Sequence, residues 1–182
     1  MSSQIDLDLI ASLLSDGKII AYPTESCFGL GCDPDNEHAL NKILTLKQRS
    51  IEQGVIIIGD SFHQLQQYCH SLTTDEVSQM ENAWPGPTTY IVPSSTHHWL
   101  RGKHSSIGIR VPGHDLARQI CTIFAKPIVS TSANPHGLES AKTASMVRHY
   151  FHDQVDYIVD EEVGGRQLPS QIVDLKTGKI LR

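Results

Sequence analysis

The chain of 182 residues lacks most features that mark exported, membrane-spanning or disulfide-bonded proteins. Its four cysteines form no C-x-x-C pair and stand in or beside apolar segments, so we expect reduced thiols rather than disulfides or a redox site. No stretch approaches the roughly 20 apolar residues that cross a bilayer, and the N-terminus lacks a basic segment followed by an apolar run. These absences predict a cytoplasmic protein that neither crosses nor contacts a membrane.

Positive charge is also scarce. The 15 Lys and Arg residues are outnumbered by 20 Asp and Glu, which gives a net charge of −5. Nonspecific affinity for nucleic acid comes mainly from neutralising phosphates, so this balance argues against a surface built as a whole for nucleic acid. A local basic cavity stays compatible with it. Six basic residues lie outside the most acidic stretches and are free to converge: Lys47, Arg49, Arg101, Lys103, Arg110 and Arg182.

Metal ligands are missing as well. His97, His98 and His104 are close in sequence, but no cysteine or carboxylate shares zinc-ligand spacing with them. We therefore expect these histidines in a surface loop and no metal held by the protein itself. The segment 94–106 that contains them is rich in Ser, His and Gly, and is our candidate for a loop that closes over a site.

Apolar residues alternate between strand-like and helix-like spacing along the whole chain, which predicts a single mixed α/β domain over residues 1–182. A chain of this length buries roughly 70% of its unfolded surface on folding and needs no disulfide or metal for stability. Helices are predicted around 7–14, 40–47, 62–69, 75–83, 116–124 and 146–150. Strands are predicted at 19–22, 55–58, 89–92, 107–111, 128–130 and 157–159, with a hairpin formed by 172–174 and 179–181. The continuous apolar run at 55–58 is typical of a strand covered on both faces.

Three polar stretches follow predicted strands or helices directly. They are Tyr22-Pro23-Thr24-Glu25-Ser26, Lys47-Gln48-Arg49 and Ser130-Thr131-Ser132-Ala133-Asn134. In open α/β sheets, ligands gather at the carboxyl ends of strands. Lysine and arginine suit phosphate oxygens, and the Ser/Thr/Asn cluster supplies several short side-chain donors. The three stretches together predict an anion-binding cleft that holds a nucleotide without a Walker loop.

Each stretch also has a simpler explanation. Two basic residues at the end of a helix are stabilised there by the helix dipole, whatever they bind. A Ser/Thr/Asn cluster forms local turns that finish a strand, and Pro23 is able to end a strand by removing a backbone donor. Arg110, at the end of another predicted strand, could form a surface ion pair. Taken one at a time, these patterns leave structural and functional interpretations open.

In combination they are more specific. The chain resembles the YrdC/TsaC family of threonylcarbamoyl-AMP synthases, whose signature joins Y-P-T-E-[TS]-x-[YF]-G-L-G, K-x-R and S-x-S-A-N. Further family-like segments are W-P-G-P-T-T at 84–89, I-R-V-P at 109–112, P-S-Q-I-V-D at 169–174 and I-L-R at 180–182. The resemblance covers nearly the whole chain. It implies a single-domain YrdC-like α/β fold, an open twisted mixed sheet with flanking helices and a concave, locally basic cleft.

The resemblance also implies an activity, L-threonylcarbamoyladenylate synthase. The substrates would be L-threonine, bicarbonate and ATP, with Mg²⁺ bound through ATP, and the products threonylcarbamoyl-AMP and pyrophosphate. The implied role is modification of the adenosine next to the anticodon of tRNA, together with partner proteins of the TsaD, TsaB and TsaE type. Relatives with an extra C-terminal domain tend to carry Asn and His after K-x-R, where this chain has Gln53 and Ile58. The short, single-domain type is therefore the better match.

The family motifs assign roles to individual residues. Lys47 and Arg49 are the expected catalytic pair, in contact with ATP phosphates. The residues expected to bind ATP are Lys47, Arg49, Ser106, Ser132, Asn134, Ser140 and Arg182. Those expected to bind threonine are Thr24, Ser26, Arg110, Ser130 and Ser170. A planar guanidinium suits the threonine carboxylate, and Glu25 is expected to orient an ammonium or a metal.

Two other functions remain open at this stage. The first is a non-enzymatic maturation factor that binds double-stranded RNA or tRNA in the same basic concavity, with steeply salt-dependent affinity and no ATP turnover. The second is formation of a carbamoyl-adenylate from carbamoyl phosphate, as in the YrdC-type domain of hydrogenase maturation factors. Those proteins normally carry acylphosphatase and zinc-finger regions, which this sequence does not contain.

Overall fold

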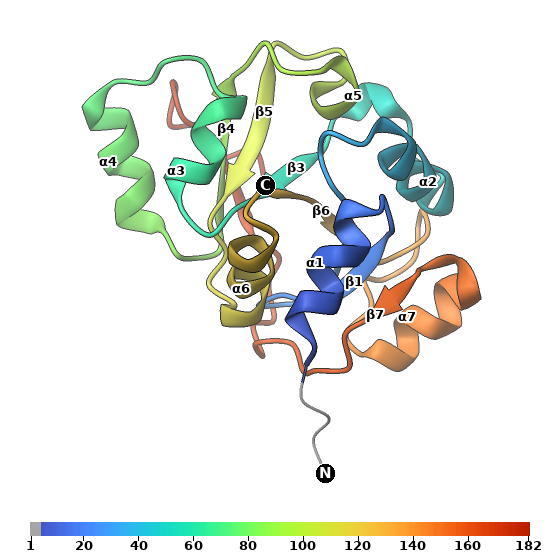
Figure 1. Ribbon diagram of the computed structural model, residues 1–182. Coiled ribbons are helices and arrows are strands. Elements are labelled where there is room, and N and C mark those ends of the chain that lie inside the picture. Colours follow the sequence, from blue (N-terminus) through green and yellow to red (C-terminus); the bar gives the residue numbers. More distant parts are fainter. Residues whose placement is uncertain (1–4) are drawn as a thin grey trace.

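Residues 5–182 are described here by a computed structural model, in which helices flank one eight-stranded sheet (Figure 1). The strand order is β7-β1-β2-β6-β3-β5-β4-β8. The strands are β1 (Ile20–Pro23), β2 (Phe28–Gly31), β3 (Ile56–Ile58), β4 (Thr88–Pro93), β5 (Ser106–Arg110), β6 (Ile128–Ser132), β7 (Tyr157–Ile158) and β8 (Gln171–Asp174). The helices are α1 (Leu7–Ser15), α2 (Glu37–Lys47), α3 (Phe62–Leu65), α4 (Thr74–Ala83), α5 (His98–Arg101), α6 (Asp115–Phe124) and α7 (Ala144–Phe151), with 3₁₀ turns at Ile51–Gln53, Gln66–Tyr68 and His152–Gln154.

The sheet is mixed. Neighbouring strands are parallel in the pairs β7/β1, β3/β5 and β4/β8, and antiparallel in β1/β2, β2/β6, β6/β3 and β5/β4. This confirms the predicted mixed α/β fold with an open sheet and flanking helices. It also sets the geometry of the site, because alternate residues along every strand face opposite sides of the sheet.

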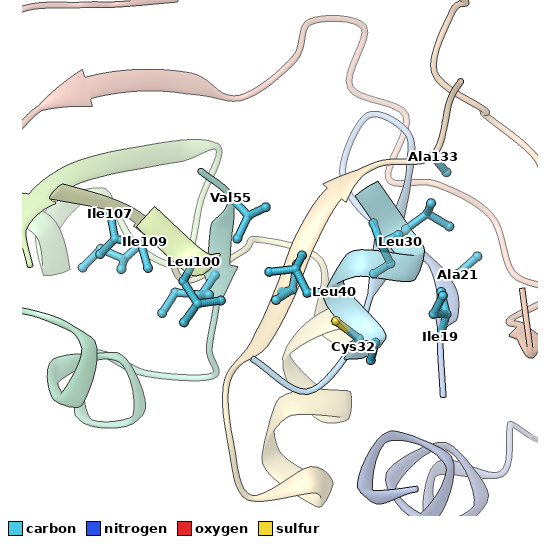
Figure 2. Close-up of a cluster of buried hydrophobic side chains, with 14 of the residues drawn as sticks. Ile19, Ala21, Leu30, Cys32, Leu40, Val55, Leu100, Ile107, Ile109 and Ala133 are labelled. Atoms are coloured by element: carbon cyan, nitrogen blue, oxygen red, sulfur yellow. The ribbon is translucent and has the colours of Figure 1, made fainter. Parts of the chain in front are cut away.

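One face of the sheet carries the larger core. Strand residues such as Leu30, Ile57 and Ile109 are fully buried and pack in one cluster with Leu40 of α2 and Val147 of α7. Figure 2 shows this layer, with Leu40 of α2 lying over the strands close to Leu30. The amphipathic pattern of α2 explains its position, since its buried positions recur at helical spacing along one side.

The other face is only partly covered. Helices α1 and α6 lie side by side over it (Figure 1), and the second core cluster includes Ile10 of α1, Ile120 of α6, and Ile20, Tyr22 and Ile128 from the strands. No helix of the described chain covers the neighbouring part of this face, formed by β3, β5, β4 and β8. The site-facing residues of these strands therefore line cavities instead of a core.

Several local predictions need correction. β2 was not predicted, because two glycines interrupt its apolar residues and weaken the strand signal. The strand at 55–58 is not covered on both faces along its whole length, since Ile56 lines a cavity. The expected C-terminal hairpin, in contrast, is present: backbone hydrogen bonds join Ile172 to Leu181 and Arg182, and Asp174 to Lys179, around a bridge between Val173 and Ile180. On its other side, β8 pairs with β4, which was not predicted. The segment 94–106 contains α5, whose Leu100 is fully buried.

Candidate functional site

A cavity of about 240 Å³ lies on the uncovered part of the sheet. Its walls come from segments far apart in sequence: the loop after β1, the ends of β5 and β6, the turn after α2 and the stretch before β8. It is lined by Thr24, Ser26, Cys27, Phe28, Gly29, Arg49, Ile56, Ile58, Thr89, Arg110, Ser130, Thr131, Ser132, Ser140, Pro169, Ser170, Ile172 and Arg182.

Most residues predicted from the motifs gather in this cavity. Those that line it are Thr24, Ser26, Arg49, Arg110, Ser130, Ser132, Ser140, Ser170 and Arg182. Three guanidinium groups and several hydroxyls therefore face one space, and among the described residues no Asp or Glu side chain lines it. Such a set of donors suits a ligand rich in oxygen and negative charge.

Lys47 and Asn134 lie just outside the cavity wall. The Lys47 ammonium donates to the backbone oxygens of Ser132 and Asn134, the latter at 3.0 Å, and to Asn134 Oδ1 at 3.2 Å. Lys47 is only 6% exposed. Burial, and then the charge of Arg49, lower the pKa of Lys47 to about 8. In the described structure Lys47 therefore holds the turn after β6, and its predicted contact with ATP stays a prediction.

Arg49 enters the cavity because of the way α2 ends. Lys47 is the last helical residue, and Gln48 adopts a left-handed conformation (φ 51°), which returns the Arg49 amide to the Leu44 carbonyl. The guanidinium donates to Gly54 O at 2.7 Å and Thr131 Oγ1 at 3.3 Å, while its buried Nε has no partner. Burial and the charge of Arg182 lower the pKa of Arg49. The two guanidinium groups repel each other, and an anion between them would relieve that repulsion.

Arg110 and Arg182 are both anchored at the rim. Arg110 Nε donates to Gly86 O at 2.8 Å, and its Nη2 pairs with Glu25. Glu25, expected to orient an ammonium or a metal, thus pairs with a guanidinium of the protein. Arg182 donates from Nη2 to the backbone oxygen of Ser170 at 3.1 Å and to its Oγ at 3.2 Å. The two residues from the motifs at 169–174 and 180–182 are therefore in contact.

A second cavity of about 420 Å³ adjoins the first and shares Arg49, Ile56 and Ile172 with it. Ser106, predicted to bind ATP, lines this second cavity and not the first. The other lining residues are Gln53, Gly54, Val55, Ile91, Arg101, His104, Ile107, Gly108, Asp174 and Leu181. The space is thus largely apolar with a basic edge, which suits a flat, mostly apolar group attached to an anion.

Comparison with known proteins places this arrangement in a family. A family model named for Sua5, YciO and YrdC, and described as telomere recombination, matches residues 12–182. The chain belongs to the Sua5/YciO/YrdC family. This confirms the relationship that the motifs indicated.

Relatives within the family are similar over nearly their full length. The threonylcarbamoyl-AMP synthase of Photorhabdus laumondii subsp. laumondii is 45% identical over 177 residues, covering 95% of this chain and 93% of the relative. Among solved structures, P. abyssi Sua5 complexed with L-threonine has a TM-score of 0.90 at 28% identity, covering 99% of this chain. This chain spans 55% of the length of that Sua5 chain. E. coli YciO, with a TM-score of 0.83 at 24% identity over 97% of this chain and 87% of the other, shares the fold.

Sequence reasoning missed several residues that this member of the Sua5/YciO/YrdC family places in the site. Cys27, Thr89 and Thr131 line the first cavity together with apolar residues of β3 and β8. Thr89 is fully buried, and its Oγ1 has no hydrogen-bond partner. Strand alternation offered a signal for these residues. Thr89 and Ile91 share one face of β4, and Ser106, Gly108 and Arg110 share one face of β5. Using this signal would have required knowing which face of the sheet is uncovered.

Two further findings concern the described residues as a set. Over residues 5–182, no helix is long and apolar enough to cross a membrane. Within the same range, no group of three or more His, Cys, Asp or Glu side chains is arranged to hold a metal ion.

Proposed function

We propose that this chain is a threonylcarbamoyl-AMP synthase, which joins L-threonine, bicarbonate and ATP to give threonylcarbamoyl-AMP and pyrophosphate. The observation that carries the proposal is the cavity in which Arg49, Arg110 and Arg182 face one space with serine hydroxyls, and which no Asp or Glu side chain of the described residues lines. The activity named for the 45%-identical relative and the fold shared with an L-threonine-bound Sua5 support the same reaction.

The two adjoining cavities suggest how the substrates are placed. L-threonine occupies the first cavity, with its carboxylate toward Arg110 and with Thr24, Ser26, Ser130 and Ser170 around it. The nucleotide phosphates lie toward Arg49 and Arg182, next to the hydroxyls of Ser132 and Ser140. The nucleoside extends into the second cavity past Ser106. The shared wall at Arg49 then lies at the junction of the two substrates, where the new bond forms.

The chemistry requires no nucleophilic side chain. The amine of threonine and bicarbonate form a carbamate: a C–N bond forms, a C–O bond of bicarbonate breaks, and water leaves. A carbamate oxygen then attacks the α-phosphorus of ATP, a new P–O bond forms, and the bond to the β-phosphate breaks so that pyrophosphate leaves with its charge. Catalysis of such a step rests on positioning the reactants and stabilising charge on phosphate oxygens. The guanidinium groups and hydroxyls of the cavity supply both.

Mg²⁺ enters this scheme as the counterion of ATP. Among the described residues, no Asp or Glu side chain lines the first cavity. At the second cavity, the carboxylate of Asp174 accepts hydrogen bonds from the backbone and hydroxyl of Thr177. This donor set fits a Mg²⁺ bound mainly by phosphate oxygens and water, as is usual for the ion with nucleotides. In this scheme the protein's side chains bind the phosphates, and the phosphates bind the Mg²⁺ ion.

The product is an activated acyl-adenylate and needs an acceptor. We propose that it passes to partner proteins of the TsaD, TsaB and TsaE type in the cytoplasm, for transfer to the adenosine next to the anticodon of tRNA. Binding of tRNA by this chain itself is a separate hypothesis, and a charge of −5 gives it little electrostatic support.

The test is pyrophosphate release with ATP, Mg²⁺ and bicarbonate, measured with and without L-threonine. We expect release only with threonine, and a loss of at least about 100-fold in Arg49→Ala, the scale of losing a charge-stabilising donor. Arg148→Ala is the matched control, because Arg148 is 53% exposed and pairs with Asp160 away from the cavity. If the protein releases no pyrophosphate under any of these conditions but binds double-stranded RNA, the RNA-binding alternative would replace this proposal.

A further inference from the structure

We propose that Glu25 is a positioning residue for substrate binding: it fixes the guanidinium of Arg110 so that one edge is presented to the carboxylate of the amino-acid substrate. This inference rests on the proposed function, and concerns how the same site selects its substrate. Glu25 is not among the residues that line the cavity, so it acts through Arg110.

One edge of the Arg110 guanidinium is held by hydrogen bonds to the protein. Nε donates to Gly86 O at 2.8 Å and Nη2 donates to Glu25 Oε1. These contacts hold the plane of the group from two sides. Nη1 makes no hydrogen bond to the described residues, and Arg110 lines the first cavity. A planar guanidinium has five N–H groups in a fixed fork, so fixing one edge orients the other.

The ion pair is well shielded from water. The side chains of Arg110 and Glu25 are 11% and 15% exposed, against 53% and 70% for the Arg148–Asp160 pair at the surface. A shielded charge left without its partner is strongly disfavoured. Glu25 therefore keeps Arg110 in place while no substrate is bound, and Arg110 needs little rearrangement when a carboxylate arrives.

Glu25 also joins three loops around the cavity. Its Oε1 accepts a 2.6 Å hydrogen bond from the Gly113 amide, beyond β5. Its backbone oxygen accepts from the Arg166 amide at 2.8 Å, in the segment that leads to Ser170. A Cβ at Gly113 would come within 3.0 Å of Oε1, so the glycine permits the close approach. The side chain of Glu25 thus fixes Arg110 relative to the loop that carries Gly113. The backbone of Glu25 separately holds the 164–166 segment.

Because the side chain and the backbone of Glu25 make different contacts, a substitution that changes only the side chain tests the proposal. Glu25→Gln keeps the side-chain volume, the Oε1 acceptor and every backbone contact. It removes the charge and places an amide NH2 at the position of Oε2, which is buried without a hydrogen-bond partner. We expect the KM for L-threonine to rise about tenfold, the difference between a charge-assisted and a neutral hydrogen bond in a shielded site. The KM for ATP should stay within the range of the control Asp33→Asn, which removes the charge of a similarly shielded carboxylate, 16% exposed, from its pair with Lys126.

Two additional measurements separate positioning from general support. In an Arg110→Lys background, Glu25→Gln should add nothing to the KM for threonine, because the group through which it acts is gone. In binding calorimetry, the wild type should prefer L-threonine over L-threoninamide, which lacks the carboxylate, and Glu25→Gln should lose most of that preference. If Glu25→Gln does not fold, Glu25→Asp keeps the charge with a shorter reach and should give a smaller change in the same direction.

The outcomes distinguish this inference from the proposed function. Threonine-dependent pyrophosphate release by the wild type, together with an unchanged threonine/threoninamide preference in Glu25→Gln, would overturn the inference and leave the function standing. Effects of Glu25→Gln and Arg110→Lys that simply add, or an equal rise in the KM for ATP, would also overturn it. A wild type that neither binds threonine nor releases pyrophosphate would overturn both.

Discussion

The phenol of Tyr22 donates a 2.7 Å hydrogen bond to the hydroxyl oxygen of Ser130, which lies 108 residues further along the chain. Tyr22 is fully buried, and that burial raises the pKa of its phenol, so the group stays neutral and keeps its proton. Within residues 5–182, Ser130 Oγ is the one partner of this phenol, and a buried hydroxyl needs an acceptor. The proton of Ser130 is therefore free to point into the cavity that Ser130 lines.

Removing this hydrogen bond should weaken substrate binding more than folding. We expect Tyr22→Phe to raise the KM for L-threonine several-fold, because Ser130 is then free to rotate away from the ligand. The free energy of unfolding should fall by about 1 kcal/mol, the usual net value of one hydrogen bond. Steady-state kinetics and urea unfolding would measure the two effects. In Ser130→Ala, adding Tyr22→Phe should no longer change the KM; a further rise would contradict the coupling.

The ring of Tyr22 also explains two glycines of β2. Tyr22 is paired with Gly29 across the antiparallel strands, and a Cβ at Gly31 would come within 2.9 Å of the Tyr22 ring and 3.0 Å of the Val129 carbonyl. We expect Gly31→Ala to lower the free energy of unfolding by about 1–3 kcal/mol through overpacking. Urea unfolding would detect this. Part of the loss should be recovered in Tyr22→Leu/Gly31→Ala, and a fully additive double variant would argue against the ring contact as the cause.

The pKa of Lys47 predicts a pH dependence of stability. Burial lowers this pKa from 10.5 to about 8, so between those values the unfolded chain binds more protons than the folded one. The free energy of unfolding contributed by Lys47 should therefore rise with pH from about 8 to about 10.5. Burial raises the pKa of the Cys32 and Cys121 thiols, which has the opposite effect, so the comparison must be with a variant.

We expect the difference in unfolding free energy between the wild type and Lys47→Met to grow in favour of the wild type over this pH range. Urea unfolding at several pH values would measure it. A difference that is flat or that shrinks as the pH rises would mean that the Lys47 ammonium is not penalised by its burial.

Thr89 offers a test of the unpartnered hydroxyl in the ligand-free site. Because its Oγ1 is buried without a hydrogen-bond partner, replacing it by a methyl group should remove a desolvation penalty. We expect Thr89→Val to raise the free energy of unfolding of the ligand-free protein by about 1 kcal/mol. Thr89→Ser, which keeps the hydroxyl and loses the methyl group, should lower it by about the same amount. A destabilised Thr89→Val would indicate a bound water at this position.

Local patterns were sufficient for most of the elements. The helical spacing of Leu40, Ile43 and Leu44 predicted α2, and the alternation of apolar and polar segments predicted the mixed fold. Strand β2 was missed because it contains two glycines, which leave room for the ring of Tyr22 on the neighbouring strand. That requirement is invisible to a local window, since it exists only once the two strands pair.

The sequence by itself determined the family, the order of the elements and the residue types of the site, because these depend on motifs and on periodicity within short segments. Only the tertiary structure decided what each side chain contacts. Lys47 turns inward to oxygens of Ser132 and Asn134, 85 and 87 residues away, and Glu25 pairs with Arg110, also 85 residues away. Such contacts follow from which sheet face is covered and where each strand ends. Those are properties of the packed chain, set by the burial of apolar surface over its whole length.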